Sequence, residues 1–328
     1  MTRAIVITSI YNPTESIEKF SKIKGYKLIV VGDKKTPINW NYNNVSYISI
    51  ENQDRIGSHL NKVLPFNHYC RKMIGYLFAI KNGAEYIVDT DDDNIPKNEW
   101  CFPDFEGVFS QIANDLGFIN IYQLYTDQNI WPRGLPLNLI TKNFDLENKL
   151  DLNFCKIGIW QGLADEDPDV DAVYRLTSNA PCYFKNRPPI VLGENTITPF
   201  NTQNTIVRKE LFPLMYLPTH VSFRFTDILR GLVAQPIMWL YGFKLGYIDA
   251  TVIQKRNCHD FMSDFVSEIP MYESCDKVIE IVQSVISKEN LLTHNLINAY
   301  IALESHGIVI DKEIITLKAW LMDLESIN

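Results

Sequence analysis

Short apolar runs alternate with segments of helical periodicity along the first hundred residues. The apolar runs have strand length, end in turn residues and are predicted as buried strands: residues 4–8, 27–31, 45–50 and 86–88. Residues 14–20 and 69–81 instead place apolar side chains on one helical face, and Asn82-Gly83 ends the second helix. Strands that alternate with helices predict a mostly parallel, doubly wound α/β sheet.

The pattern changes beyond residue 100. From about residue 102 to residue 200 the chain is rich in Pro, Gly and aromatic residues, which argues for functional loops and against long helices. A helical pattern returns at residues 225–240, and amphipathic helices are predicted after Pro270 at residues 278–287, 291–303 and 314–324. We therefore expect an α/β domain over residues 1–268 and a helical C-terminal appendage over residues 269–328.

Composition restricts the classes of function. The chain has 328 residues, of which 46% are hydrophobic and 21% charged, as in ordinary globular proteins. A net charge of −8 without a basic run argues against a nucleic-acid partner. The six cysteines lack C-x-x-C spacing, which favours reduced thiols over a zinc site or a disulfide scaffold. Without a signal-peptide core or a membrane-span pattern, the chain is expected to be soluble and cytoplasmic.

The segment Asp89-Thr90-Asp91-Asp92-Asp93 places four carboxylates at the end of the fourth predicted strand. Like charges this close repel each other, and a divalent cation among them removes that cost. Alternate side chains of an extended backbone point to the same side, which pairs Asp91 with Asp93 and leaves Asp89 to support the strand end. Oxygen ligands suit Mn²⁺ or Mg²⁺ bound to the phosphates of a nucleotide. A solvated acidic turn is the alternative, whereas the spacing of an EF-hand loop is absent.

A metal site usually has a remote ligand, and His259 is the candidate. Its neighbours Lys255 and Arg256 suit a diphosphate. An ordinary surface or core histidine is the alternative for this position.

Nucleotide contacts are expected from the ends of the first strands, where ligands of such sheets bind. Thr8 and Ser9 follow the first strand and Asp33 follows the second, which makes them candidates for the base and the ribose. Arg71 and Lys72 begin the helix at 69–81 and can reach phosphate, although a surface cation is the commoner fate of such residues.

Several separated blocks occur in an order that resembles the STELLO glycosyltransferase-like family. They are IVDTDDDNIP at 87–96, WPRG at 131–134, WQGLAD at 160–165, DPDVDAVYRLT at 167–177, PFNTQNT at 199–205, VSFRFTDILRG at 221–231 and RNCHDF at 256–261. The resemblance extends from about residue 4 to about residue 270. It implies a GT-A type fold, which is a Rossmann-like, mostly parallel mixed sheet flanked by helices.

A weaker resemblance links the chain to the reversibly glycosylated polypeptides, which are UDP-arabinopyranose mutases. It rests on the acidic triplet at 91–93, the loop around Arg133 and the segment 226–228. Both families imply a nucleotide-sugar ligand. The expected activity is metal-dependent transfer of a sugar from a nucleoside diphosphate sugar, with UDP as the expected nucleotide, to an unknown glycan, protein or small-molecule acceptor. The alternatives are a mutase-like isomerase and a non-catalytic nucleotide-sugar-binding scaffold.

The same resemblance gives roles to residues of the later blocks. Asp227, near the start of a predicted helix, is a candidate general base for an acceptor hydroxyl, with a helix-capping carboxylate as the alternative. Arg133 is expected to contact phosphate, the acceptor or the sugar. Trp160 is a candidate platform for a sugar face, and Asp165 and Asp169 are candidates for sugar hydroxyls.

Overall fold

The structure is a computed structural model that describes residues 2–255 and 260–327. The strands are β1 (Thr2–Thr8), β2 (Tyr26–Val31), β3 (Val45–Ile48), β4 (Ala84–Thr90), β5 (Asn94–Pro96), β6 (Glu106–Ile112), β7 (Gly117–Phe118), β8 (Leu150–Asp165), β9 (Ile190–Val191), β10 (Thr196–Ile197), β11 (Asn204–Arg208) and β12 (Lys244–Gln254). The α-helices are α1 (Glu15–Phe20), α2 (Ile50–Gln53), α3 (Lys72–Lys81), α4 (Ala172–Thr177), α5 (Thr226–Leu240), α6 (Phe261–Gln283), α7 (Leu292–Ser305) and α8 (Asp311–Glu325). The 3-10 helices are η1 (Leu60–Lys62), η2 (Tyr69–Arg71), η3 (Ile121–Leu124), η4 (Leu137–Leu139), η5 (Glu147–Lys149) and η6 (Lys209–Met215).

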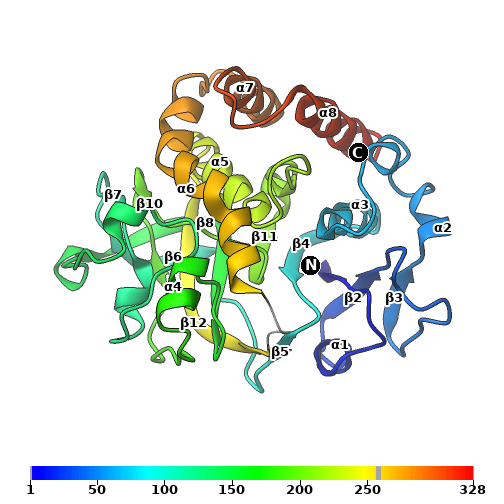
Figure 1. The fold of residues 1–328 in the computed structure, drawn as a ribbon, viewed down its shortest axis with the longest axis horizontal. Helices are drawn as coiled ribbons and strands as arrows, with labels where there is room; N and C mark the ends of the chain where they lie inside the picture. The colour runs from blue at the N-terminus through cyan, green and yellow to red at the C-terminus, as the bar shows by residue number, and fades with distance from the viewer. Residues whose placement is uncertain (1, 256–259, 328) are drawn as a thin grey trace.

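The apolar runs predicted as strands form the parallel part of the central sheet (Figure 1). Strand β1 pairs in parallel with β2 and β4, and β2 pairs in parallel with β3. Successive residues of β1 belong to different hydrophobic clusters, with Ile5 in one and Val6 in the other. Because both faces of this strand are buried, its sequence is a continuous apolar run.

The sheet becomes mixed beyond β4. Its order is β3-β2-β1-β4-β11-β8-β6-β9-β12-β5, and β8 also pairs with β12. Strand β11 runs antiparallel to both β4 and β8, while β12 runs parallel to β8. The predicted α/β class, with a mixed sheet flanked by helices, is confirmed.

The long strand β8 lies in the region that the sequence predicted to be loops. Gly158 and Gly162 interrupt its apolar pattern, so the hydrophobic periodicity does not predict this strand. In the folded chain both glycines allow close packing. A Cβ on Gly162 would lie 2.3 Å from the Asn204 side chain on β11, and one on Gly158 would lie 2.3 Å from Leu211.

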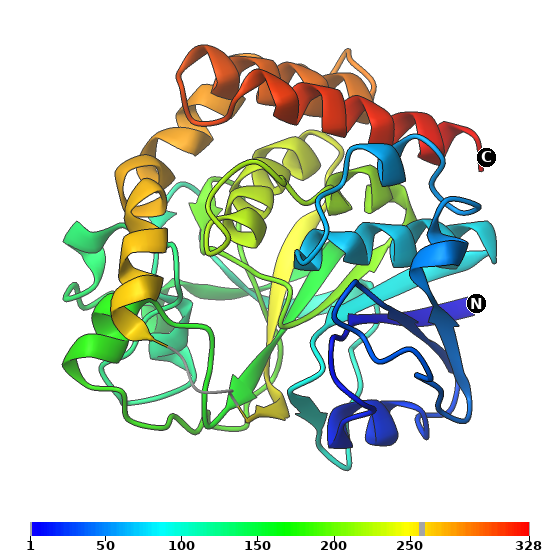
Figure 2. The same cartoon turned by 45° about the vertical axis from the view of Figure 1, so that its right-hand side comes forward.

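The C-terminal helices pack on the α/β core. Helices α7 and α8 run across the side of the molecule that carries α5 and α3 (Figures 1 and 2). Trp320 of α8 and Tyr300 of α7 belong to the same buried hydrophobic cluster as Leu77 of α3 and Leu232 of α5. The proposed appendage therefore shares the main core of the molecule.

Buried carboxylates also attach α8 to the rest of the chain. Glu313 accepts hydrogen bonds from the backbone N–H groups of Thr219 and His220, at 2.9 and 2.7 Å. Asp323 accepts one from the backbone N–H of Leu60 at 2.7 Å. Each carboxylate satisfies loop donors that burial would otherwise leave without partners.

Helix α6 begins earlier than the sequence predicted. It starts at Phe261 and continues through Pro270, so the expected boundary between residues 268 and 269 lies inside the helix. The side chain of Asp260 caps its first turn by accepting hydrogen bonds from the N–H groups of Met262 and Ser263. Pro270 removes one backbone donor, but α6 packs against both α5 and α4, which supports the helix. None of the helices in the described part of the chain combines the length and apolar character needed to cross a bilayer.

Candidate active site

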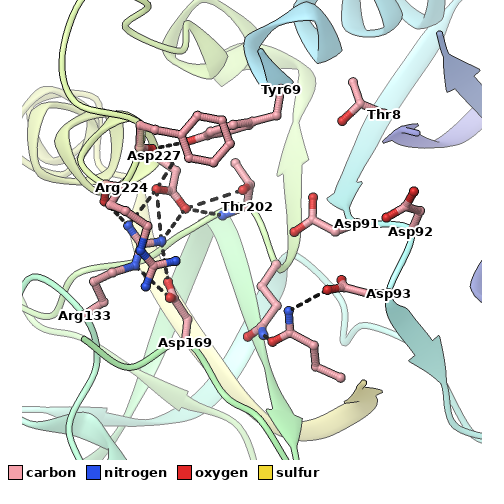
Figure 3. A pocket seen from close by; sticks show the side chains of 13 residues that line it. Thr8, Tyr69, Asp91, Asp92, Asp93, Arg133, Asp169, Thr202, Arg224 and Asp227 are labelled. Atoms are coloured by element: carbon pink, nitrogen blue, oxygen red, sulfur yellow. Dashed lines mark hydrogen bonds and ion pairs between the residues drawn. The ribbon is translucent and has the colours of Figure 1, made fainter. Parts of the chain in front are cut away.

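A cleft of about 880 Å³ opens at the carboxyl ends of β1 and β4 (Figure 3). Its lining comes from segments far apart in the sequence: Thr8, Tyr69, Asp91, Asp92, Asp93, Arg133, Asp169, Thr202, Gln203, Phe223, Arg224, Asp227 and Gln254. In the close view the acidic cluster 91–93 lies on one side, and Arg133, Asp169 and Asp227 lie on the other. The position agrees with the rule that open α/β sheets bind ligands beyond the carboxyl ends of their strands.

Asp89 lies behind the cleft wall, at the end of β4. Its carboxylate is fully buried between two cations, with Lys72 Nζ at 2.8 Å and Arg230 Nη1 at 2.9 Å. Burial alone would lower the pKa of the Lys72 ammonium, but Asp89 and Asp91 raise it above its ordinary value. Lys72 is therefore a permanent cation, and Asp89 supports the strand end as the sequence suggested.

The three aspartates that follow face the cleft, and each has a different partner. Lys72 Nζ lies 2.6 Å from Asp91 Oδ1, the Ser9 hydroxyl donates to Asp92, and Gln254 Nε2 donates to Asp93 Oδ2 at 3.2 Å. Burial raises the pKa of Asp91 to about 7, and the nearby charge of Asp93 adds to the shift while Lys72 opposes it. Burial also raises the pKa of Asp92 to about 6.

These pKa shifts predict an unusual effect of Asp91→Asn on the metal-free protein. A carboxyl whose pKa is raised on folding stabilises the fold at pH values below its unfolded pKa, near 4, and loses that contribution as pH rises through about 7. The asparagine variant should therefore be more stable than the native protein at pH 8, by about 1 kcal/mol because a third of the side chain faces solvent. Denaturant titrations at pH 3 and pH 8 test this, since the gain should vanish at pH 3, below the unfolded pKa. A gain that is equal at both pH values would contradict it.

The donor set of the cleft suits a divalent cation in part. Asp91 and Asp93 present hard oxygen ligands, and a cation between them would relieve their repulsion. Within residues 2–255 and 260–327, no group of three or more His, Cys, Asp or Glu side chains is arranged to hold a metal ion. The predicted remote ligand, His259, lies outside the described residues. The described protein residues thus supply two carboxylates, and further ligands have to come from elsewhere.

Arg133 joins two carboxylates on the opposite side of the cleft. Its Nε and Nη2 donate to the two oxygens of Asp169 at 2.7 and 2.8 Å, while Nη2 also donates to Asp227 Oδ2 at 3.0 Å. All three side chains are at least nine-tenths buried. Although burial alone lowers the pKa of the Arg133 guanidinium, Asp169 and Asp227 hold it well above its usual value. A bidentate pair of this kind fixes the positions of all three groups.

Gly134 lets the loop bring Arg133 to the start of α5. It has a φ of 90°, which favours glycine, and a Cβ there would lie 2.5 Å from the side chain of Ile228 on α5. The Trp-Pro-Arg-Gly block therefore has a local structural reason, namely close approach of this loop to the helix.

Asp227 is the second residue of α5, and several donors surround it. Besides Arg133, the backbone N–H of Thr202 and the hydroxyl of Tyr69 donate to it at 3.3 and 3.4 Å. Burial raises the pKa of the Tyr69 phenol well above its usual value, so this group remains a neutral donor. The carboxylate of Asp227 thus lines the cleft, while its Oδ1 also accepts a hydrogen bond from the N–H of Ile228 in the first turn of α5 at 3.1 Å.

A second hollow of about 610 Å³ adjoins the cleft and shares Thr8, Tyr69, Asp92 and Phe223 with it. It contains the predicted nucleoside contacts: Thr8, Ser9 and Asp33. Asp33 accepts hydrogen bonds from the N–H groups of Lys34 and His68 at 2.6 and 3.2 Å. The tertiary structure thus brings the three predicted residues together.

Aromatic rings form one wall of this hollow, which the sequence did not predict. The rings of His68 and Tyr69 stack 5.2 Å apart, and Phe223, about half exposed, meets both edge-on. Burial lowers the pKa of His68 to about 4, so the imidazole is neutral near pH 7. His68 directly precedes the predicted helix 69–81, and Tyr69 begins it. Only this position could have indicated that the two rings line the hollow.

Arg71 is not brought to the cleft. Its guanidinium is fully buried, donates to Gln53 Oε1 from Nε at 2.8 Å and lies 4.3 Å from the ring of Phe66. Lys72 reaches the cleft only indirectly, through Asp91. The expectation that these two cations meet phosphate therefore does not fit their contacts, because each is already bound within the protein.

Trp160 and Asp165 also lie outside the cleft lining. Trp160 is fully buried on β8 and donates from its indole N–H to the backbone carbonyl of Asp104 at 3.3 Å, which fits a core residue rather than an open sugar platform. Asp165 pairs with Lys97 at 2.6 Å and accepts from the N–H of Phe184. Of the two predicted sugar-binding aspartates, the structure places only Asp169 at the cleft.

In sequence, the chain is similar to known glycosyltransferases. Residues 224–328 match the family model of STELLO glycosyltransferases. The chain is 26% identical to the probable glycosyltransferases STELLO1 and STELLO2 of Arabidopsis thaliana, over 99% and 98% of its own length. It spans 44% of the length of each of these relatives. A solved structure described as that of a mycobacterial protein aligns over 87% of this chain and 74% of its own, with 10% identity and a TM-score of 0.39.

Proposed function

We propose that this chain, which is related to the STELLO glycosyltransferases, transfers a sugar from a nucleoside diphosphate sugar to a glycan, protein or small-molecule acceptor. The resemblance that the sequence blocks predicted is confirmed by these matches. We further propose that the nucleotide is UDP and that the transfer reaction depends on Mn²⁺ or Mg²⁺.

The charge of the cleft is the observation that carries this proposal. Among the described residues, five aspartates and two arginines line it. Both arginines are already paired with carboxylates, Arg133 with Asp169 and Asp227, and Arg224 with Glu268 at 2.9 Å. A diphosphate that enters this cleft meets an excess of negative charge, so its binding requires a cation that arrives from solution.

The adjoining hollow supports the choice of a nucleotide as the ligand. Its aromatic wall can stack a base, while the carboxylate of Asp33 and the hydroxyls of Thr8 and Ser9 suit the polar edges of a base or a ribose. Because it joins the cleft at Asp92, a nucleoside bound there would direct its phosphates toward the acidic cluster.

Asp91 and Asp93 are the residues that would hold the cation. When bound, the cation would supply charge to offset the negative charge that develops on the leaving diphosphate. The other roles belong to the opposite wall. Arg133 orients Asp227, and Asp227 either accepts the proton of the acceptor hydroxyl, if the configuration of the sugar is inverted, or positions the acceptor, if it is retained.

A thermal-shift screen of nucleotide sugars with and without Mn²⁺ tests the proposal. A saturating UDP-sugar should raise Tm by several degrees only when Mn²⁺ is present, and the shift should vanish in Asp93→Ala. Asp127→Ala, which removes an exposed carboxylate elsewhere, should keep it. Equal stabilisation of Asp93→Ala would refute the metal site.

The reaction itself separates the remaining alternatives. Release of UDP that increases with an added acceptor supports transfer. Isomerisation of the UDP-sugar without acceptor would favour a mutase, and metal-dependent binding without any turnover would favour a non-catalytic scaffold.

A further inference from the structure

Lys72 is a fully buried cation that contacts the acidic cluster from behind. Its Nζ lies 2.8 Å from Asp89 Oδ1 and 2.6 Å from Asp91 Oδ1. Asp89 has a second cation, Arg230, at 2.9 Å on its other oxygen. The inner part of the cluster thus has two carboxylates and two cations, and its charge is balanced before any metal ion binds.

This arrangement weakens the attraction of Asp91 for a metal ion. The Asp91 side chain is about one-third exposed, so a cation in the cleft can reach it. That cation would share the Asp91 carboxylate with the ammonium group of Lys72, which is buried and held by Asp89 and Asp91. Two cations on one carboxylate repel each other, and the cost is larger in a partly buried site than in water.

The described residues also provide few ligands. Asp91 and Asp93 are two carboxylates, and no group of three metal-binding side chains exists within residues 2–255 and 260–327. Hard divalent cations prefer six or more oxygen ligands, of which Mg²⁺ commonly takes several from phosphates. A nucleoside diphosphate would add both oxygen ligands and negative charge, and these are the two things that the bare site lacks.

We infer that Lys72 is a positioning residue that keeps the affinity for the free metal ion low, so that the cation binds together with a nucleoside diphosphate. The inference rests on the proposed function for the identity of the diphosphate. Each ligand should therefore strengthen binding of the other. The cation reduces the repulsion between the diphosphate and the five aspartates of the cleft, and the diphosphate reduces the repulsion between the cation and Lys72. Neither ligand alone removes both penalties.

Measurements of Mn²⁺ binding test the inference without any assay of activity. The decrease in the electron paramagnetic resonance signal of free Mn²⁺ reports the bound fraction. The native protein should bind Mn²⁺ at least about tenfold more tightly with saturating UDP than without it. Equal affinity in the two titrations would overturn the coupling between the cation and the nucleotide, and this comparison requires no variant.

Lys72→Met provides the direct test, since methionine retains an apolar stem in the buried site. The variant should bind free Mn²⁺ about tenfold more tightly than the native protein, and its dependence on UDP should shrink. If Lys72 had only a structural role, its replacement would lower the affinity for Mn²⁺. A gain in Mn²⁺ affinity therefore indicates that Lys72 opposes metal binding. Lys81→Met, on the exposed end of the same helix, should behave as the native protein.

Each remaining result has a defined meaning. A folded Lys72→Met variant with unchanged or weaker Mn²⁺ affinity overturns the role of Lys72. If UDP fails to increase Mn²⁺ binding in every protein while Lys72→Met still binds free Mn²⁺ more tightly, the proposed nucleotide function fails and the role of Lys72 stands. If Lys72→Met does not fold, the two titrations of the native protein decide the inference.

Discussion

Arg133→Met is expected to lower the free energy of unfolding by about 3–5 kcal/mol, because it leaves two buried carboxylates without their shared cation. Asp169 and Asp227 are each less than 10% exposed, and each receives hydrogen bonds from the guanidinium. Methionine fills much of the space of the side chain but cannot donate. Equilibrium unfolding in denaturant, followed by circular dichroism, measures the loss.

Two further variants identify the cause of this loss. In the Arg133→Met background, Asp169→Asn should recover part of the stability, because a neutral amide does not need a buried cation. Arg55→Met removes an exposed arginine and should change stability by less than about 0.5 kcal/mol. If the Arg133 and Asp169 substitutions are simply additive, the carboxylates do not depend on Arg133 for their charge balance.

Asp227→Asn is expected to reduce sugar transfer by about 10²–10⁴-fold while the donor still binds. The amide has nearly the same shape, and its single carbonyl oxygen can still accept from Arg133 and Thr202. Because Asp169 also holds Arg133 in place, the wall of the cleft should keep its geometry. It cannot accept a proton from an acceptor hydroxyl. The rate of UDP release from the most stabilising UDP-sugar, measured with acceptor present, gives the effect, and the Mn²⁺-dependent thermal shift reports donor binding.

Asp165→Asn is the matched control for this prediction. The sequence blocks place Asp165 beside Asp169 as a candidate for sugar contacts, whereas the structure pairs it with Lys97 outside the cleft lining. Its transfer rate should stay within about twofold of the native rate, because Asp165 is bound to Lys97 and to the N–H of Phe184 outside the cleft lining. A near-native rate for Asp227→Asn would exclude Asp227 as the general base and leave it with an orienting role.

The charge of the cleft also explains why Arg133 and Lys72 are unlike free phosphate-binding cations. Each is held by two carboxylates, so each fixes the position of acidic groups that face the ligand. Their effect on an anionic substrate is therefore indirect. Arg133 controls the orientation of Asp227, and Lys72 controls the availability of Asp91.

The amino-acid sequence by itself determined the parts that depend on near neighbours along the chain. The buried strands β1, β2 and β4 appear as apolar runs because neither face meets water. The acidic cluster follows β4 directly, so its place at a carboxyl end follows from the strand. Helix α5 matches the predicted segment 225–240 closely, because its periodicity is continuous.

Only the tertiary structure decided how the charged and aromatic side chains are used. Arg133 meets Asp169 and Asp227, which are 36 and 94 residues away along the chain, and no local pattern records those pairings. Arg71 and Lys72 are adjacent, yet one binds neutral groups and the other binds the acidic cluster. A charged side chain takes its role from the partners that burial forces on it, and those partners come from distant segments brought together by packing of the sheet and helices.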